Sequence, residues 1–179
     1  MMRLLDPAGY RRMPWANGRG HTTEIARMED DAGLLWRLSM AQVTEDGPFS
    51  LFPGIDRSLT VIDGAGFALE SPRWRLAAAP FLPVGFPGDV AVSARDVTGA
   101  SVDFNVMWRR GALMARVRSG TGMFAAESRS VAVLALADQQ ITVNDSRFQV
   151  PAQGCLMGGA QLQIVADALV LVVELSDTG

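Results

Sequence analysis

Two short apolar runs are separated by turn signals in the stretch Ser58-Leu59-Thr60-Val61-Ile62-Asp63-Gly64-Ala65-Gly66-Phe67-Ala68-Leu69-Glu70-Ser71-Pro72. Asp63-Gly64 and Ser71-Pro72 are dipeptides that favour turns, because Gly tolerates positive φ, Pro fixes φ and Asp and Ser hydrogen-bond the nearby backbone. Short runs bounded by such turns are typical of β-strands. The stretch therefore predicts two short strands with a turn between them.

The same pattern of short apolar runs separated by turns recurs through the rest of the chain. The runs are Thr22 to Met28, Leu34 to Val43, Ser58 to Asp63, Gly66 to Ser71, Val102 to Arg109, Val131 to Ala137, Leu162 to Val165 and Leu169 to Leu175. Apart from one helical turn expected near Tyr10, no segment sustains an apolar stripe at helical spacing. The prediction is an all-β protein built as a β-barrel or sandwich.

Composition and charge place the chain among globular proteins and exclude several partners. The 179 residues are 49% hydrophobic and 20% charged, which predicts a packed core. The net charge of -3 comes without a basic block that could contact phosphates, so nucleic acid is not an expected partner.

The only cysteine, Cys155, leaves no disulfide within the chain and no cysteine-based zinc cluster. We expect it to be a small buried hydrophobe on a strand. The N-terminal residues lack the apolar core of a signal peptide, and the later apolar runs are too short to span a bilayer. A cytoplasmic location without a membrane partner is the expectation.

The domain organisation predicted is a single unit over residues 1–179, composed of two fused β halves. No linker rich in Ser, Gly or charge divides the chain. The best candidate seam is the turn-like Arg110-Gly111, which gives halves of 1–110 and 111–179.

Two strands carry one apolar face and one mixed face. Between Leu34 and Val43, Arg37, Ser39 and Ala41 share the mixed face; between Val102 and Arg109, it carries Asp103, Asn105 and Met107. Such a face either lines a ligand-sized lumen or simply faces water. We predict that Asp103 and Asn105 point to the same side, opposite Phe104.

Metal and phosphate sites are not expected. The only histidine is His21, whereas a transition-metal site in a β-barrel usually takes two or three imidazoles. No spaced carboxylate loop for Ca²⁺ or Mg²⁺ is present. The glycines that precede His21 are not followed by Gly-Lys-Ser/Thr, and the next residues favour a strand. Neither a metal nor another cofactor is therefore predicted.

The sequence does not identify a chemical reaction. No Gly-x-Ser-x-Gly occurs, and a single histidine leaves little room for a triad. Paired carboxylates could act as general acid and base, and the candidates are Asp56, Asp89 and Asp103. The sequence sets neither the distances between these carboxylates nor their pKa values. No catalytic residue is assigned.

Four ordered motifs between Pro14 and Met107 resemble the HutD/Ves family of cupin-like proteins. The motifs are Pro14-Trp15-x-Asn17-Gly18-x-Gly20-x-Thr22-Thr23-Glu24-Ile25, Trp36-Arg37-Leu38-Ser39, Asp46-Gly47-Pro48-Phe49-Ser50-Leu51-Phe52-Pro53-Gly54-Ile55-Asp56-Arg57 and Asp103-Phe104-Asn105-Val106-Met107. The resemblance implies a bicupin β fold without the usual cupin metal ligands. For the HutD branch it implies a link to histidine utilisation, through regulators that sense a pathway intermediate. Ala16 and Arg19 depart from the family's usual Trp-Lys-Asn-Gly-Gly-Gly.

The leading hypothesis is a non-catalytic protein that binds a small carboxylate-bearing metabolite. Arg57 is the first candidate for the carboxylate partner, because guanidinium offers a planar fork of donors. The further ligand-binding candidates are Asn17, Arg37, Asp103 and Asn105. Arg57 could instead form a structural ion pair with Asp56 or another turn carboxylate.

Two other classes of function stay open. One is a metal-independent enzyme, an isomerase or lyase that uses Asp or Glu as its base. The other is a structural interaction protein. A homodimer is compatible with each of the three hypotheses.

Overall fold

The computed structural model describes residues 1–15, 18 and 20–178. Within them the chain forms β-strands and one short 3-10 helix, so the all-β prediction is confirmed. No described helix is long and apolar enough to cross a membrane. The chain divides into two units: a terminal unit of Met1–Tyr10 with Leu113–Gly179, and a central unit of Arg11–Ala112.

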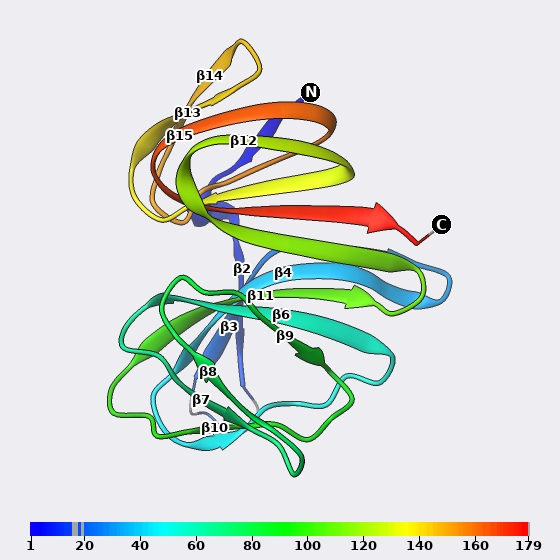
Figure 1. Cartoon of the computed structure of the whole chain (residues 1–179), viewed down its shortest axis with the longest axis vertical. Coiled ribbons are helices and arrows are strands. Elements are labelled where there is room, and N and C mark those ends of the chain that lie inside the picture. The colour runs from blue at the N-terminus through cyan, green and yellow to red at the C-terminus, as the bar shows by residue number, and fades with distance from the viewer. Residues whose placement is uncertain (16–17, 19, 179) are drawn as a thin grey trace. The chain divides into compact units, whose positions relative to one another are not determined.

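The terminal unit is built around two strands of 23 residues each. Its elements are β1 (Arg3–Leu5), η1 (Pro7–Gly9), β12 (Leu113–Ala135), β13 (Gln139–Val143), β14 (Ser146–Val150) and β15 (Cys155–Asp177). β12 pairs with β15 in two registers, so that Ala132 lies opposite both Met157 and Val173. β15 also pairs with β1 and β13, which adds these strands to a curled sheet (Figure 1).

The core of the terminal unit consists of aliphatic side chains from both long strands and from β13. It includes the fully buried Val133, Ile141, Leu156, Ile164 and Val172. The first residues of the chain are held to the terminal unit through Tyr10. The Tyr10 hydroxyl donates to the backbone oxygen of Gln153 over 2.7 Å. The helical turn expected near Tyr10 is η1, where the Asp6 carboxylate accepts from the Ala8 amide over 2.8 Å.

The central unit consists of two sheets packed on each other. Its strands are β2 (Arg11–Pro14), β3 (His21–Asp30), β4 (Gly33–Val43), β5 (Gly47–Pro48), β6 (Ile55–Asp63), β7 (Phe67–Glu70), β8 (Arg75–Ala78), β9 (Val84–Pro87), β10 (Ser93–Arg95) and β11 (Ser101–Arg109). The larger sheet has the order β2-β3-β4-β11-β6-β9, and the smaller has the order β5-β10-β7-β8. Figure 1 shows β7, β8 and β10 forming a layer opposite β4, β6 and β11.

An apolar cluster fills part of the space between the two sheets of the central unit. Leu59 and Val61 from β6 pack there with Phe67 and Leu69 from β7 and with Ala94 from β10. These residues stand on the inner face of the larger sheet or on the facing side of the smaller one. The remaining inner face carries the polar residues that form the candidate site.

The halves predicted at 1–110 and 111–179 differ from the two units in two respects. The second boundary lies between Ala112 and Leu113, two residues beyond the predicted seam, but Met1–Tyr10 belongs with the C-terminal segment. The reason is the pairing of β1 with β15, in which Arg3 lies opposite Met157. A contact over this separation leaves no local signal in the sequence.

Candidate functional site

A pocket of about 510 Å³ lies inside the central unit, on the inner face of the larger sheet. Strands β3, β4, β6 and β11 supply one wall, and the segment 44–52 with Ala94 supplies the other. The lining residues are Trp15, Thr22, Arg37, Ser39, Ala41, Val43, Thr44, Glu45, Asp46, Gly47, Pro48, Phe49, Ser50, Phe52, Arg57, Ala94, Asn105 and Met107. The pocket therefore combines two arginines with aromatic, amide and hydroxyl groups.

Strand register explains why the polar residues meet. Asn105 on β11 lies opposite Ser39 on β4, and Met107 lies opposite both Arg37 on β4 and Arg57 on β6. Side chains that are level across neighbouring strands share one face of the sheet. The two arginines thus enter the pocket on either side of Met107. The mixed faces predicted from the sequence line a lumen and do not face water.

Arg57 is the most deeply placed cation of the pocket, with only 5% of the residue exposed. Its Nη2 donates to the Oδ1 of Asn105 over 2.6 Å. Its guanidinium carbon lies 5.3, 5.7 and 5.0 Å from the ring centroids of Phe49, Phe52 and Phe86, within the range of cation-π attraction. Burial lowers the pKa of Arg57 to about 10, against the opposing effect of Asp103, so the group remains a cation at neutral pH.

Asp103 is fully buried behind Asn105 and does not line the pocket. Its Oδ1 accepts a short hydrogen bond from the Nδ2 of Asn105, while its Oδ2 has no hydrogen-bond partner among the described residues. Burial raises the pKa of Asp103 to about 7, although the charge of Arg57 and the bond from Asn105 act in the opposite direction. The Asp103 carboxyl, the Asn105 amide and the Arg57 guanidinium therefore form a continuous polar chain that ends at the pocket.

The prediction that Asp103 and Asn105 share one side of the strand is confirmed. The hydrogen bond between the two side chains requires it, and Phe104 between them is fully buried on the opposite face. A register shift occurs beside Asp103 where β11 meets β6. The run from Asp103 to Trp108 nevertheless stays in regular register with both neighbouring strands.

Arg37 is the second arginine of the pocket and is held by Glu24. The Nε of Arg37 lies 3.2 Å from the Oε2 of Glu24, and both side chains are largely removed from solvent. Arg27 approaches the same carboxylate at 3.8 Å from the solvent side. Burial lowers the pKa of Arg37, while Glu24 raises it. Glu24 therefore offsets the charge of Arg37 before any ligand arrives.

Trp15 forms an edge of the pocket through its indole ring. Its Nε1 donates to the Oγ1 of Thr22 over 2.9 Å, and its backbone amide donates to the carbonyl of Gly20 over 2.9 Å. A Cβ atom at Gly20 would lie 2.8 Å from the ring of Trp15, so glycine is needed at this position. Asn17, the ligand-binding candidate of this motif, lies outside the described residues.

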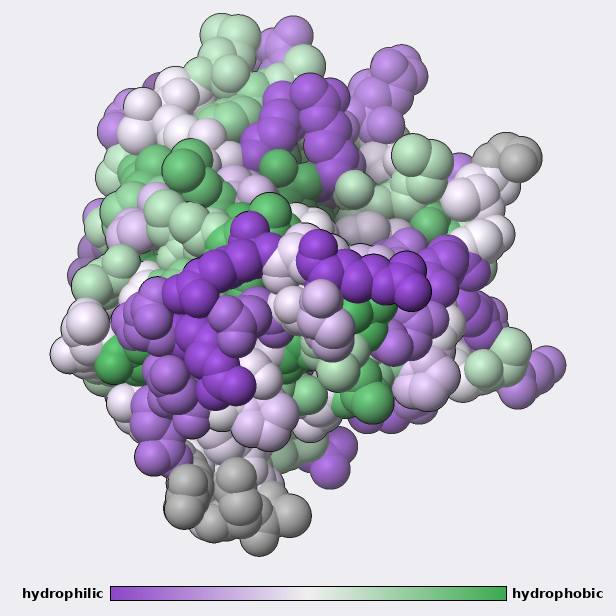
Figure 2. Space-filling view, turned by 60° about the horizontal axis from the view of Figure 1, so that its bottom comes forward, coloured by the Kyte–Doolittle hydropathy of each residue, from purple (hydrophilic) through white to green (hydrophobic). Residues whose placement is uncertain are grey.

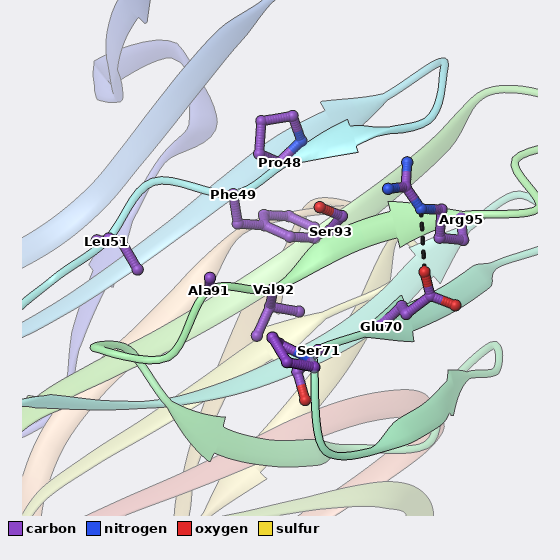
Figure 3. Close-up of a pocket in the computed structure, with 10 residues that line it drawn as sticks. Pro48, Phe49, Leu51, Glu70, Ser71, Ala91, Val92, Ser93 and Arg95 are labelled. Atoms are coloured by element: carbon purple, nitrogen blue, oxygen red, sulfur yellow. Dashed lines mark hydrogen bonds and ion pairs between the residues drawn. The ribbon is translucent and has the colours of Figure 1, made fainter.

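A second hollow of about 470 Å³ adjoins the pocket and shares Pro48 and Phe49 with it. Figure 3 shows Phe49 and Val92 directed into this hollow, with the ion pair of Arg95 and Glu70 at one end. The Arg95 Nε lies 3.3 Å from the Glu70 Oε1, and both side chains are exposed. It offers no buried cation comparable to Arg57.

The alternative ion pair of Arg57 with Asp56 is wrong. Neighbouring residues on β6 point to opposite faces, and Asp56 accepts hydrogen bonds from the Nε and Nη2 of Arg110 over 2.9 and 2.7 Å. Arg110 also pairs with Asp89 at 2.8 Å and holds the pKa of that carboxyl at about 2. Asp56 and Asp89 thus belong to one surface network, and Asp103 lies apart from them. The three carboxylates do not form an acid-base pair.

The single histidine and the single cysteine of the sequence lie outside the pocket lining. His21 lies on β3, where its Nδ1 is 3.1 Å from the Nη2 of Arg12, and it does not line the pocket. Cys155 is fully buried at the start of β15, as expected of a small hydrophobe, and burial raises the pKa of its thiol to about 12. No group of three or more potential His, Cys, Asp or Glu metal ligands occurs among the described residues.

Of the five predicted ligand-binding residues, Arg57, Arg37 and Asn105 line the pocket. Asp103 contacts it through Asn105, and Asn17 is not described. Sequence reasoning missed Glu24 as the partner of Arg37 and Trp15 with Thr22 as a pocket edge. Glu24 on β3 lies opposite Ser39 on β4. The same alternation of faces, applied to β3, would have placed Glu24 on the mixed face.

Comparison with known proteins shows the family of the chain. The HutD family model matches residues 7–171. The chain belongs to the HutD family. An uncharacterized 21.2 kDa protein in the hutC 3' region of Pseudomonas putida is 37% identical to it over 160 residues, covering 86% of this chain and 83% of the relative.

Solved structures agree with membership of the HutD family. HutD from Pseudomonas fluorescens, determined in a formate condition, is 31% identical, with a TM-score of 0.87 and coverage of 100% of both chains. A cupin 2 conserved barrel domain protein from Leptotrichia buccalis is 9% identical, with a TM-score of 0.57 and coverage of 87% of this chain and 88% of its own. The second likeness concerns the fold alone, and it confirms the cupin-like architecture predicted from the motifs.

Proposed function

We propose that this HutD-family protein is a non-catalytic binder of a small carboxylate-bearing metabolite, which it holds in the pocket of the central unit. The observation that carries the proposal is the buried guanidinium of Arg57 at the wall of this pocket. Among the described residues its Nε has no hydrogen-bond partner, and its Nη2 is bonded to a neutral amide. A carboxylate is the group whose geometry matches such a fork of donors.

The surroundings of Arg57 support an anionic ligand because they leave its charge incompletely compensated. Removing a cation from water costs free energy unless an anion and hydrogen bonds replace the lost hydration. The charge of Asp103 favours the Arg57 cation, but the neutral Asn105 stands between the two groups and takes the hydrogen bond of Arg57. The three phenylalanine rings contribute cation-π attraction without any net charge. A ligand carboxylate would complete this partial compensation.

The rest of the pocket supports a ligand of modest size with both apolar and polar parts. Met107, Phe49 and Phe52 offer apolar contacts, while Ser39 and Thr22 offer hydroxyl groups. The volume of about 510 Å³ lies in the range typical of small-molecule sites. These features favour a metabolite over a peptide or a larger partner.

We further propose a regulatory role in histidine utilisation, exercised in the cytoplasm. This step rests on family membership and on the location of the Pseudomonas putida relative in the hutC 3' region. In this role the bound metabolite reports the state of the pathway, and the protein does not consume it.

A metal-independent isomerase or lyase is the second candidate, and one observation favours it. The pKa of Asp103, about 7, suits a general base or acid near neutral pH. However, Asp103 does not line the pocket, and Asn105 stands between it and Arg57. A substrate proton would therefore have no direct path to this carboxyl, so binding without turnover is the better supported function.

The experiment is a thermal-shift screen of the carboxylate intermediates of histidine degradation, followed by analysis of each stabilising compound after long incubation. A ligand at a hundred times its Kd stabilises the folded state by about 2.7 kcal/mol. The proposal expects stabilisation by at least one carboxylate that is recovered unchanged. Conversion of the compound to a product would favour the enzyme, and absence of any stabilisation would favour a structural interaction protein.

A further inference from the structure

A buried acid lies next to the pocket and is connected to its main cation. Asp103 is fully buried, and within the described part of the chain its carboxyl accepts a side-chain hydrogen bond from Asn105 alone. The opposite end of the Asn105 amide accepts from Arg57 over 2.6 Å. One neutral side chain therefore connects a buried carboxyl to the cation that faces the ligand space.

We infer that a carboxylate ligand enters this pocket together with one proton, which is taken up by Asp103. This inference rests on the proposed function and specifies how the same site is regulated. With Asp103 ionised, Arg57 and Asp103 together are electrically neutral. Addition of a ligand carboxylate would leave one excess negative charge in a poorly hydrated region. Protonation of Asp103 restores neutrality, with Arg57 paired to the ligand.

The geometry provides a place for the proton. The Oδ1 of Asp103 accepts from Asn105, but its Oδ2 has no hydrogen-bond partner among the described residues. A proton on Oδ2 leaves intact both the bond that Asn105 donates to Asp103 and the bond that Arg57 donates to Asn105. The pocket can therefore change its charge without rearranging its hydrogen bonds. Since the pKa of Asp103 is already raised to about 7 by burial, uptake occurs near neutral pH.

The other charged groups around Asp103 do not supply this compensation. The charged residues of β6 are Arg57 itself, Asp56, which pairs with Arg110, and the exposed Asp63. On β4 the charge is Arg37, which is paired with Glu24 of β3. The neighbours level with Asp103 are Ala41 on β4 and Val61 on β6. The smaller sheet packs the apolar Phe67, Leu69 and Ala94 against this region. Glu45 and Asp46 line the pocket from the segment 44–52 and would repel the ligand anion.

The probe for the test is acetate, which has one carboxylate, no other ionisable group and a constant charge between pH 6 and about pH 8. NMR titration of the intact chain gives its Kd at each pH. If the ligand-bound form holds the Asp103 proton throughout this range, a free-state pKa of about 7 makes the Kd about tenfold higher at pH 8 than at pH 6. Calorimetry in two buffers of different ionisation enthalpy should show net proton uptake on binding at pH 7 and above.

Two variants separate Asp103 from other titrating groups. Asp103→Asn keeps the size of the side chain and should bind acetate with a Kd that no longer depends on pH. His21→Gln is the matched control, because histidine also changes charge near neutral pH as a residue type, but His21 lies outside the pocket lining. The control should retain the tenfold dependence. The proton count in the wild-type protein answers the question even if Asp103→Asn does not fold.

Three outcomes would overturn the inference, and they differ in what they say about the proposed function. Acetate binding with a Kd that is equal at pH 6 and pH 8, or without proton uptake, removes the coupling and leaves the carboxylate site. Loss of the pH dependence in His21→Gln would assign it to the histidine. Absence of acetate binding at every pH, up to the concentration that the protein tolerates, would contradict both the coupling and the carboxylate pocket.

Discussion

Arg57 and Asn105 are joined by a buried hydrogen bond of 2.6 Å between β6 and β11, although 48 positions separate them in the chain. This bond orients the Asn105 amide, because its oxygen must face Arg57 and its nitrogen must then face Asp103. The arginine is thereby directed to the pocket by a neutral partner, which leaves its charge available.

The raised pKa of Asp103 predicts a specific change of stability with pH. An aspartate in an unfolded chain has a pKa of about 3.9, whereas in the folded state the pKa is about 7. Between these values the folded protein holds a proton that the unfolded chain has released. The contribution of this group to the free energy of unfolding is therefore complete below pH 4, and is lost as pH rises through about pH 7.

The substitution Asp103→Asn should remove the loss of stability that ionisation of Asp103 causes as pH rises. In urea unfolding, the free energy of unfolding of the variant, relative to the wild-type protein, should rise between pH 5 and about pH 8. Taking the difference between the two proteins cancels the contributions of surface carboxylates such as Asp89. Parallel stability curves for the two proteins would mean that Asp103 is not buried as described.

Gly20 provides a test of the Trp15 edge. In Gly20→Ala the added methyl group would lie within 2.8 Å of the Trp15 ring, which the bond to Thr22 holds in place. We expect a loss of about 1 to 3 kcal/mol in the free energy of unfolding, as for other overpacked sites, together with weaker acetate binding. Gly99→Ala is the matched control, since no atom lies within 4 Å of a Cβ there. Equal behaviour of the two variants would exclude this role of Trp15.

Protein purified without added metal should contain negligible transition metal. The chain has one histidine and one cysteine, and the described residues include no group of three or more candidate ligands. Elemental analysis of the purified protein is the measurement. A tightly bound metal ion at close to one per chain would show that the cupin-like fold retains a metal site built in another way.

Local sequence patterns predicted the strands and faces that build the site. Alternation alone placed Arg37, Ser39 and Asn105 on mixed faces, and the structure brings those faces to one pocket. Alternation within one strand does not predict which residues of two neighbouring strands lie opposite each other. Nothing local indicates that Met107 lies between Arg37 and Arg57, or that Asn105 rather than Asp56 would bond Arg57.

The length of the strands in the terminal unit could not be predicted from local sequence patterns. The runs predicted at Leu162 to Val165 and Leu169 to Leu175 are parts of the single strand β15. Before both runs, at Gly159, β15 approaches its neighbour β12 closely without ending. A Cβ at Gly159 would lie 2.0 Å from the carbonyl oxygen of Arg129. Glycine in a strand can mark such an approach as well as a turn, so its presence alone did not distinguish the two.

The most direct test of the carboxylate pocket is calorimetric titration of Arg57→Ala with whichever carboxylate stabilises the wild-type protein. Charge-assisted hydrogen bonds contribute about 1.5 to 3 kcal/mol, so the variant should bind roughly ten- to a hundredfold more weakly. Arg110→Ala is the matched control: it removes an arginine that pairs with Asp56 and Asp89 outside the pocket and should leave affinity unchanged. If folded Arg57→Ala instead binds the carboxylate with wild-type affinity, Arg57 is not the carboxylate partner and the central claim is wrong.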